Sequence, residues 1–135
     1  MRVDFTNVKS NFDPLPEGNY SCTVFSIQEK KSQAGNPYLN FQLKIQGGDF
    51  DGRRAFYIAS LLPQSLWNLK QVLQALGMSE EELKGNFDLD ISDLLGRECD
   101  ITIEWEMYQG ENRDRVVKIA APGSLTTTGD LNLYR

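Results

Sequence analysis

The chain has 135 residues, of which 40% are apolar and 24% charged, which is typical of one globular domain that buries its own core. No window approaches the roughly 20 apolar residues of a membrane span and no signal peptide is visible, so we expect a cytoplasmic protein. There is no histidine, and two cysteines cannot complete a four-ligand zinc site. This excludes histidine-dependent hydrolases and zinc enzymes, and we expect neither catalysis nor a cofactor or metal.

The net charge of −5 is unevenly distributed along the chain. Residues 79–106 hold ten acids and two bases, a local net of −8, while the remaining residues hold twelve bases and nine acids, a net of +3. This asymmetry permits a mildly basic face on an otherwise acidic protein.

The first 46 residues predict an arm and two strands. Residues 1–17 alternate poorly and lead to a turn at Gly18, so we expect an extended arm attached through Phe5, Val8 and Phe12. In residues 19–29 the apolar positions change phase at Val24 and Phe25, which predicts a β-bulge or bend there. After a loop at residues 30–37, the segment 38–46 is the clearest strand of the sequence. Its inward positions are Leu39, Phe41, Leu43 and Ile45, and its outward positions are Tyr38, Asn40, Gln42 and Lys44.

Residues 53–60 predict a third strand, joined to the second by a GGDFDG turn. We expect its large apolar residues, Phe56 and Ile58, to point inward. Its outward positions would then be Arg53, Ala55 and Tyr57.

A helical insertion is expected at residues 62–96. Pro63 and Gly77 bound a helix with an apolar stripe at Leu66, Leu69, Leu73 and Leu76, widened by Trp67 and Val72. Ser79 and Glu82 form a capping-box pattern that predicts a short acidic helix ending at Gly85, and residues 90–95 predict one further turn.

Two more strands complete the predicted elements, at residues 99–108 and 113–121, separated by a turn at residues 109–112. In the first of them Cys99, Ile101, Ile103, Trp105 and Met107 would face the core, whereas Asp100, Thr102, Glu104, Glu106 and Tyr108 would face outward. Cys22 and Cys99 are interpreted as buried free thiols. Residues 122–135 are expected to form a flexible tail.

Three strands, a helix and two strands favour an OB-fold, a five-stranded Greek-key barrel with a helix between strands three and four. An SH3-like barrel would lack the amphipathic helix. Residues 1–121 would then form a single OB-type domain, and its ligand face would be strands two and three with the loops joining strands one to two and four to five.

Single-strand binding by such a barrel requires aromatic side chains that stack on bases and cations that contact phosphates. The predicted outward residues supply both. The candidate DNA-binding residues are Lys30, Lys31, Asn36, Tyr38, Asn40, Lys44, Arg53, Arg54, Tyr57, Tyr108, Arg113 and Arg115. Trp67 and Trp105 lie in apolar registers and are expected in the core instead.

Several short motifs are similar to those of a family of small tailed-phage proteins, long of unknown function and regarded as single-stranded-DNA-binding proteins of OB type. The motifs are Asp4-Phe5, Leu15-Pro16-Glu17-Gly18, Gly35-Asn36-Pro37-Tyr38-Leu39-Asn40, Leu66-Trp67-Asn68-Leu69 with Ala75-Leu76-Gly77, and Leu94-Leu95-Gly96-Arg97. The resemblance implies a role in phage DNA replication or recombination in the host bacterial cytoplasm. Many single-strand binders end in an acidic tail that recruits partners, but here the tail has one acid, Asp130, so recruitment through the tail is not implied.

Two functions therefore follow from the sequence. The first is binding of single-stranded DNA with little sequence preference, with replication or recombination proteins as further partners and a homodimer as the default assembly. The alternative is an OB-type protein-interaction module that binds a host or phage protein through the same face or through the acidic insertion.

Overall fold

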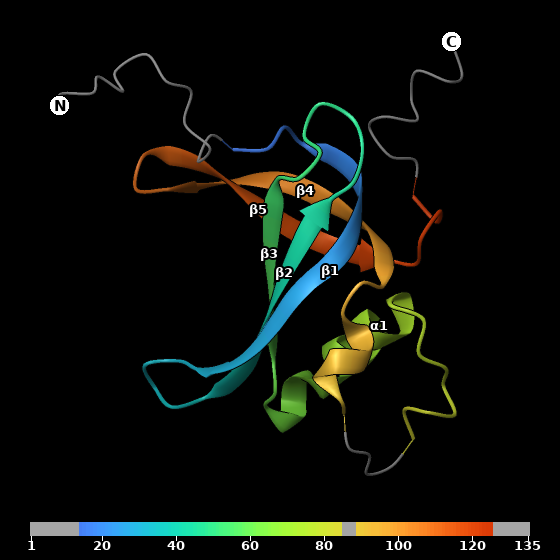
Figure 1. Ribbon diagram of the computed structural model, residues 1–135. Helices are drawn as coiled ribbons and strands as arrows, with labels where there is room; N and C mark the ends of the chain where they lie inside the picture. The colour runs from blue at the N-terminus through green and yellow to red at the C-terminus, as the bar shows by residue number, and fades with distance from the viewer. Residues whose placement is uncertain (1–13, 85–88, 126–135) are drawn as a thin grey trace, which may run out of the picture.

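The computed structural model describes residues 14–84 and 89–125, which form one five-stranded antiparallel sheet and a single α-helix (Figure 1). The sheet contains β1 (Gly18–Lys31), β2 (Pro37–Ile45), β3 (Arg54–Ser60), β4 (Glu98–Tyr108) and β5 (Glu111–Ala120) in the order β3-β2-β1-β4-β5. Three strands, a helical insertion and two strands is the predicted order of elements. No helix in the described part of the chain is long and apolar enough to cross a membrane.

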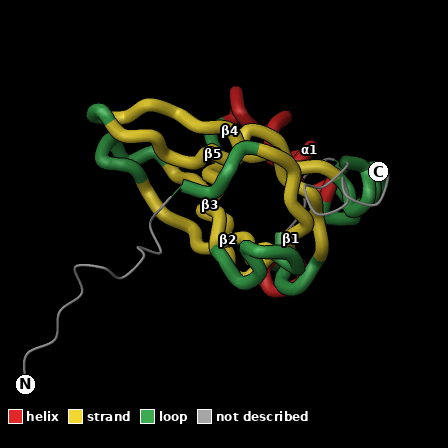
Figure 2. Tube along the Cα trace, turned by 90° about the horizontal axis from the view of Figure 1, so that it is seen from above, coloured by secondary structure: helices red, strands yellow, loops and turns green. Residues whose placement is uncertain are grey.

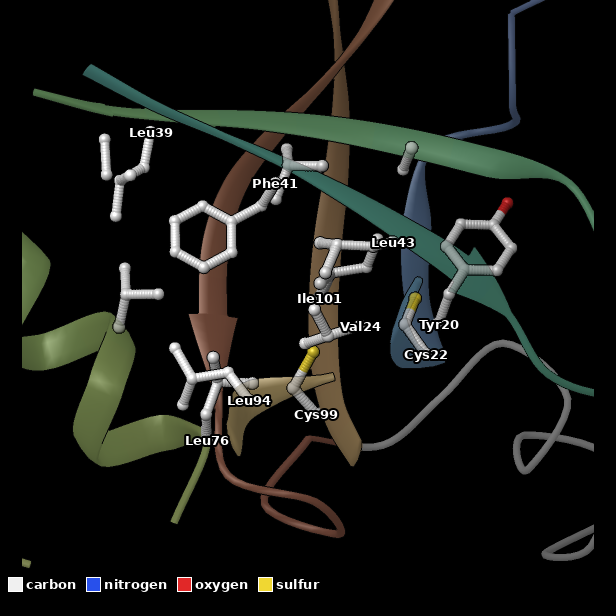
Figure 3. Packing of buried hydrophobic residues seen from close by; sticks show 14 of the residues in the cluster. Tyr20, Cys22, Val24, Leu39, Phe41, Leu43, Leu76, Leu94, Cys99 and Ile101 are labelled. Carbon is white, nitrogen blue, oxygen red and sulfur yellow. The ribbon is translucent and has the colours of Figure 1, made fainter. Parts of the chain in front are cut away.

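The sheet is strongly curled, and its interior is filled by buried side chains (Figures 2 and 3). The edge strands β3 and β5 approach each other closely. They remain at opposite ends of the hydrogen-bonded order, so backbone pairing among the described residues does not close the sheet into a barrel.

The predicted bulge in β1 is confirmed. Val24 pairs with Leu43 and Ser26 with Gln42, which leaves Phe25 without a partner on β2. At the same point the Val24 amide donates to the Arg97 carbonyl at 2.9 Å, and the Gly96 amide donates to the Val24 carbonyl at 2.8 Å. The chain entering β4 therefore holds the bulge in place, and the extra residue turns the Phe25 side chain out of the core.

The core confirms the predicted alternation of β2 (Figure 3). All four expected inward residues of β2 are buried, together with Leu15 from the segment before β1. Cys22 and Cys99 are buried, free and directly opposite each other on β1 and β4. Burial raises the pKa of the Cys22 thiol well above its usual range and that of Cys99 to about 12, so neither is a reactive thiolate at neutral pH.

The predicted orientation of β3 is wrong. Ala55 and Ala59 are buried and Tyr57 packs against the core, while Phe56 and Ile58 are exposed. The two alanines lie opposite Leu43 and Leu39, whose side chains already occupy that part of the interior. Since protein interiors are close-packed, only small side chains fit beside them, and the large apolar residues point to solvent.

The predicted helix is present as a 3₁₀ turn, η1 (Pro63–Ser65), followed by α1 (Leu66–Ala75). Leu69, Val72 and Leu73 are buried, but Trp67 is 65% exposed, so the expectation that Trp67 belongs to the core is wrong. Two residues along an α-helix turn the side chain by about 200°. Trp67 therefore lies on the side of α1 opposite to Leu69.

The rest of the insertion is less helical than expected. The capping-box contacts form, because the Glu82 amide donates to Ser79 Oγ at 3.2 Å and the Ser79 amide to Glu82 Oε1 at 3.1 Å. Residues 80–83 nevertheless form turns, not the predicted acidic helix, and Gly85 lies outside the described residues. The predicted turn at residues 90–95 is confirmed as η2 (Ile91–Leu94).

The outer half of β4 lies beyond the core. Trp105 is 46% and Met107 66% exposed, so their predicted burial is wrong. They belong to a β4–β5 hairpin that projects beyond the core (Figure 1). Trp105 Nε1 donates to the Leu15 carbonyl at 2.6 Å, and the Leu15 amide donates to Asp114 at 2.8 Å. The hairpin thus anchors the segment that precedes β1.

Asp100, predicted to face outward, is buried. Its Oδ2 accepts hydrogen bonds from the amides of Gly123 at 3.0 Å and Leu125 at 3.2 Å, so the start of the predicted tail covers it. Residues 126–135, and residues 1–13 with Phe5, Val8 and Phe12, lie outside the described residues.

Candidate nucleic-acid interface

Strands β1, β2 and β3 present one face away from the core, which we call the outer face. Residues directly opposite each other on antiparallel strands share a face, so the strand register identifies its members. In rows across the three strands they are Thr23, Lys44 and Arg54; Ser26, Gln42 and Phe56; Gln28, Asn40 and Ile58; and Lys30, Tyr38 and Ser60. Phe25 joins them from the bulge. The outer face carries three cations and no acid among these residues.

Five of the predicted site residues meet on this face: Lys30, Tyr38, Asn40, Lys44 and Arg54. They come from three different strands, and the pairing of these strands in the folded sheet brings them to one face. Lys30 and Tyr38 lie at the end near the β1–β2 loop, and Lys44 and Arg54 at the other end.

Two predicted residues lie elsewhere. Tyr57 points inward, where its ring tilts against Phe41 with centroids 6.4 Å apart and its hydroxyl accepts a hydrogen bond from Asn68 Nδ2 at 2.8 Å. Arg53 lies near the hydroxyl of Tyr20: burial raises the pKa of Tyr20, and the Arg53 charge partly offsets that rise. Neither side chain belongs to the outer face.

Two more predicted residues lie at the end of β1 and in the β1–β2 loop. Lys31 is opposite Pro37, and side chains alternate along a strand, so it points away from the side of Lys30. Asn36 is exposed in a turn closed by the Ser32 amide, which donates to the Asn36 carbonyl at 2.9 Å. Both residues border the outer face without being part of its rows.

Three large apolar residues that the sequence interpretation missed are exposed on the outer face. Phe25 is 48%, Phe56 56% and Ile58 61% exposed. The sequence of β3 did contain a signal for this orientation. Ala55 and Ala59 lie on the same face of the strand, and small residues at both positions are compatible with a face that points into the core. Large apolar side chains left in solvent on one face mark binding surfaces in soluble proteins.

Arg54 and Phe25 form a preorganised pair across the outer face. The Arg54 guanidinium carbon lies 3.6 Å from the centroid of the Phe25 ring, a cation–π contact. Because β2 separates β3 from β1, the Arg54 side chain must cross β2 to reach this ring. Its Nε atom is buried by this arrangement and has no hydrogen-bond partner among the described residues.

The remaining predicted residues, Tyr108, Arg113 and Arg115, lie on the β4–β5 hairpin. A two-residue turn with positive φ at Gln109 and Gly110 closes the hairpin, which suits the twist of antiparallel strands. The Arg113 guanidinium lies 4.4 Å from the centre of the Tyr108 ring.

Acidic residues share that hairpin face with the two arginines. Glu104 is opposite Arg115, Glu106 opposite Arg113, and Glu111 opposite Tyr108. Arg115 Nη1 also lies 3.7 Å from Glu106 Oε1. These three acids and two bases give a net charge of −1, so the hairpin face is poorly suited to contact phosphates.

The described residues contain no group of three or more acidic or cysteine side chains placed to hold a metal ion. What the site offers is exposed aromatic surface, amides and cations.

The sequence profile of the family described as "Protein of unknown function (DUF669)" matches residues 1–127. A search of curated proteins found no match.

Proposed function

The chain belongs to the DUF669 family, whose function is unknown, and we propose that it binds single-stranded DNA with little sequence preference through the outer face. The observation that carries the proposal is the exposure of Phe25 and Phe56 beside Lys44 and Arg54, in rows of β1, β2 and β3 that contain no acidic residue. Aromatic rings stack on any base, and cations track the phosphates whatever the sequence.

The arrangement of the strands supports the finer proposal of an OB-fold. OB-folds place a helix between strands three and four, and bind ligands on strands two and three between the two flanking loops. Here α1 lies between β3 and β4, and the β1–β2 and β4–β5 loops project on the same side of the molecule (Figure 1). The outer face of β2 and β3 is therefore where an OB-type ligand would bind.

The resemblance of several motifs to those of phage single-strand binders is the support for a role in phage DNA replication or recombination. Several of these motifs have structural tasks here: Leu15 is buried under the hairpin, Asn68 holds Tyr57, and Gly96 closes the bulge. They support a common fold more directly than a common ligand. The ligand is proposed from the outer face.

Fluorescence titration with an oligo-dT strand tests the proposal. Stacking of one base contributes roughly 1–3 kcal/mol, so Phe56→Ala should weaken binding by about five- to 150-fold. Trp67→Ala is the matched control, because Trp67 is another exposed aromatic residue, on α1 and away from the outer face. It should bind as wild type does.

A second candidate function is that of a protein-interaction module, which is favoured by the apolar contribution of Phe56 and Ile58 to the outer face. Failure of wild-type protein at micromolar concentration to bind oligo-dT in low salt would support this function and contradict DNA binding.

A further inference from the structure

Lys44 and Arg54 are directly opposite each other on β2 and β3 and point to the same face. Like charges in directly opposed positions of a sheet destabilise it. In the free protein this pair therefore costs folding free energy. A bound anion between the two side chains would remove that cost.

The described part of the protein supplies no such anion. Its salt bridges join Lys70 to Glu80, Lys84 to Glu81 and Arg115 to Glu106, and none includes Lys44 or Arg54. The neighbour of Lys44 on β1 is Thr23, which is uncharged. Glu98 on β4 is opposite Thr23 and is the nearest acid in this row, two strands from Lys44 and thus about 10 Å away at typical strand spacing; none of these salt bridges joins it to Lys44 or Arg54.

The Arg54 side chain is also fixed in place. Its cation–π contact with Phe25 carries it across β2, the strand that bears Lys44, and its Nε atom is inaccessible to solvent. An arginine held in this way presents its terminal nitrogens in a defined position, so little rotamer freedom is lost when an anion binds.

We propose that Lys44 and Arg54 together hold one phosphate of a nucleic-acid strand, with Phe56 as the stacking platform for an adjacent base. Phe56 follows Arg54 by two residues on the same face of β3, a distance of about 7 Å at the usual rise of a strand. The strand is thereby anchored at the Lys44 end of the outer face. This assignment rests on the proposed function and adds a specific subsite to it.

The salt dependence of oligo-dT binding tests whether the two cations share a phosphate. For single strands the slope of log K against log salt changes by about 0.7 per phosphate contact. Lys44→Gln combined with Arg54→Gln should flatten the slope by about 0.7, the loss of one contact. A loss of about 1.4 would show that each cation binds its own phosphate, and an unchanged slope that neither binds one; both results overturn the proposal.

Lys118→Gln is the matched control, since Lys118 is an exposed lysine on β5, outside the outer face. It should leave the slope unchanged. An equal flattening by this variant would show that the effect reports net charge only, which also contradicts a built subsite.

Thermal melting provides a readout that does not depend on DNA. Relief of the repulsion should leave the Lys44→Gln variant at least as stable as wild type, and inorganic pyrophosphate should raise the melting temperature of wild type more than that of the double variant. Pyrophosphate stabilisation of wild type without oligo-dT binding would retain the subsite but contradict the proposed function. Oligo-dT binding with an unchanged salt slope in the double variant would retain the proposed function but contradict the subsite.

The same melting experiment separates a nucleic-acid phosphate from a protein carboxylate. A short polyglutamate peptide that stabilised wild type through Lys44 and Arg54, where an abasic deoxyribose-phosphate oligomer did not, would overturn the proposal in favour of an acidic protein partner.

Discussion

The outer face and the β4–β5 hairpin are built from the same kinds of residue but differ in charge. Each holds an arginine over an aromatic ring, Arg54 over Phe25 at 3.6 Å and Arg113 over Tyr108 at 4.4 Å. On the hairpin, glutamates share the face with the arginines, whereas the outer face has no acid in its rows. An arginine stacked on an aromatic ring therefore indicates a phosphate site only where the strand register places no acidic residue beside it.

The largest expected effect is from Phe25→Ala, which removes an exposed ring and the support of Arg54. We expect a loss of about 1–3 kcal/mol in binding to oligo-dT, or roughly five- to 150-fold. Tyr108→Ala, at the equivalent place on the hairpin, should cost less. Fluorescence titration of both variants measures the difference, and a larger loss from Tyr108→Ala would reverse the comparison.

A moderate effect, on stability alone, is expected from Tyr57→Phe. The change removes the hydroxyl that accepts the hydrogen bond from Asn68, which should cost about 0.5–1.5 kcal/mol of folding stability. Chemical denaturation measures this cost. Binding should be unaffected because the ring points inward; weaker DNA binding by the folded variant would place Tyr57 at the interface after all.

The smallest expected effect is a gain in binding from Glu106→Gln. This change frees Arg115 from an exposed ion pair, and such pairs are worth roughly 0.2–1 kcal/mol. Affinity for oligo-dT at low salt should rise by less than about fivefold, and the gain should disappear in high salt because exposed charges are screened. Glu81→Gln is the control for net charge, because it also removes one acid and frees a base, Lys84, from an exposed ion pair away from the hairpin; it should leave binding nearly unchanged.

Local patterns were sufficient for much of the fold. The alternation in β2 identified its four buried residues, because successive side chains on a strand point to opposite faces. The phase change at Val24 and Phe25 predicted the bulge, and Pro63 and Gly77 marked the limits of the helical segment. Each of these features depends on residues that are close together in the chain.

Tertiary packing decided the composition of the candidate site. In β3 both alternating sets of residues contain apolar side chains, so the sequence does not show which set faces inward. Ala55 and Tyr57 face inward because of their neighbours from other elements. Leu43 is opposite Ala55, and Phe41 and Asn68 contact Tyr57. In β4 the apolar alternation continues through Trp105 although the core has ended, since the hairpin projects beyond the layer that could cover it. The pairing between strands likewise determines which cations have no acidic residue beside them. Sequence alone determined that aromatic residues and cations were available for a nucleic-acid interface; the register and the limited interior volume decided that Phe25, Phe56, Lys44 and Arg54 are the ones that meet.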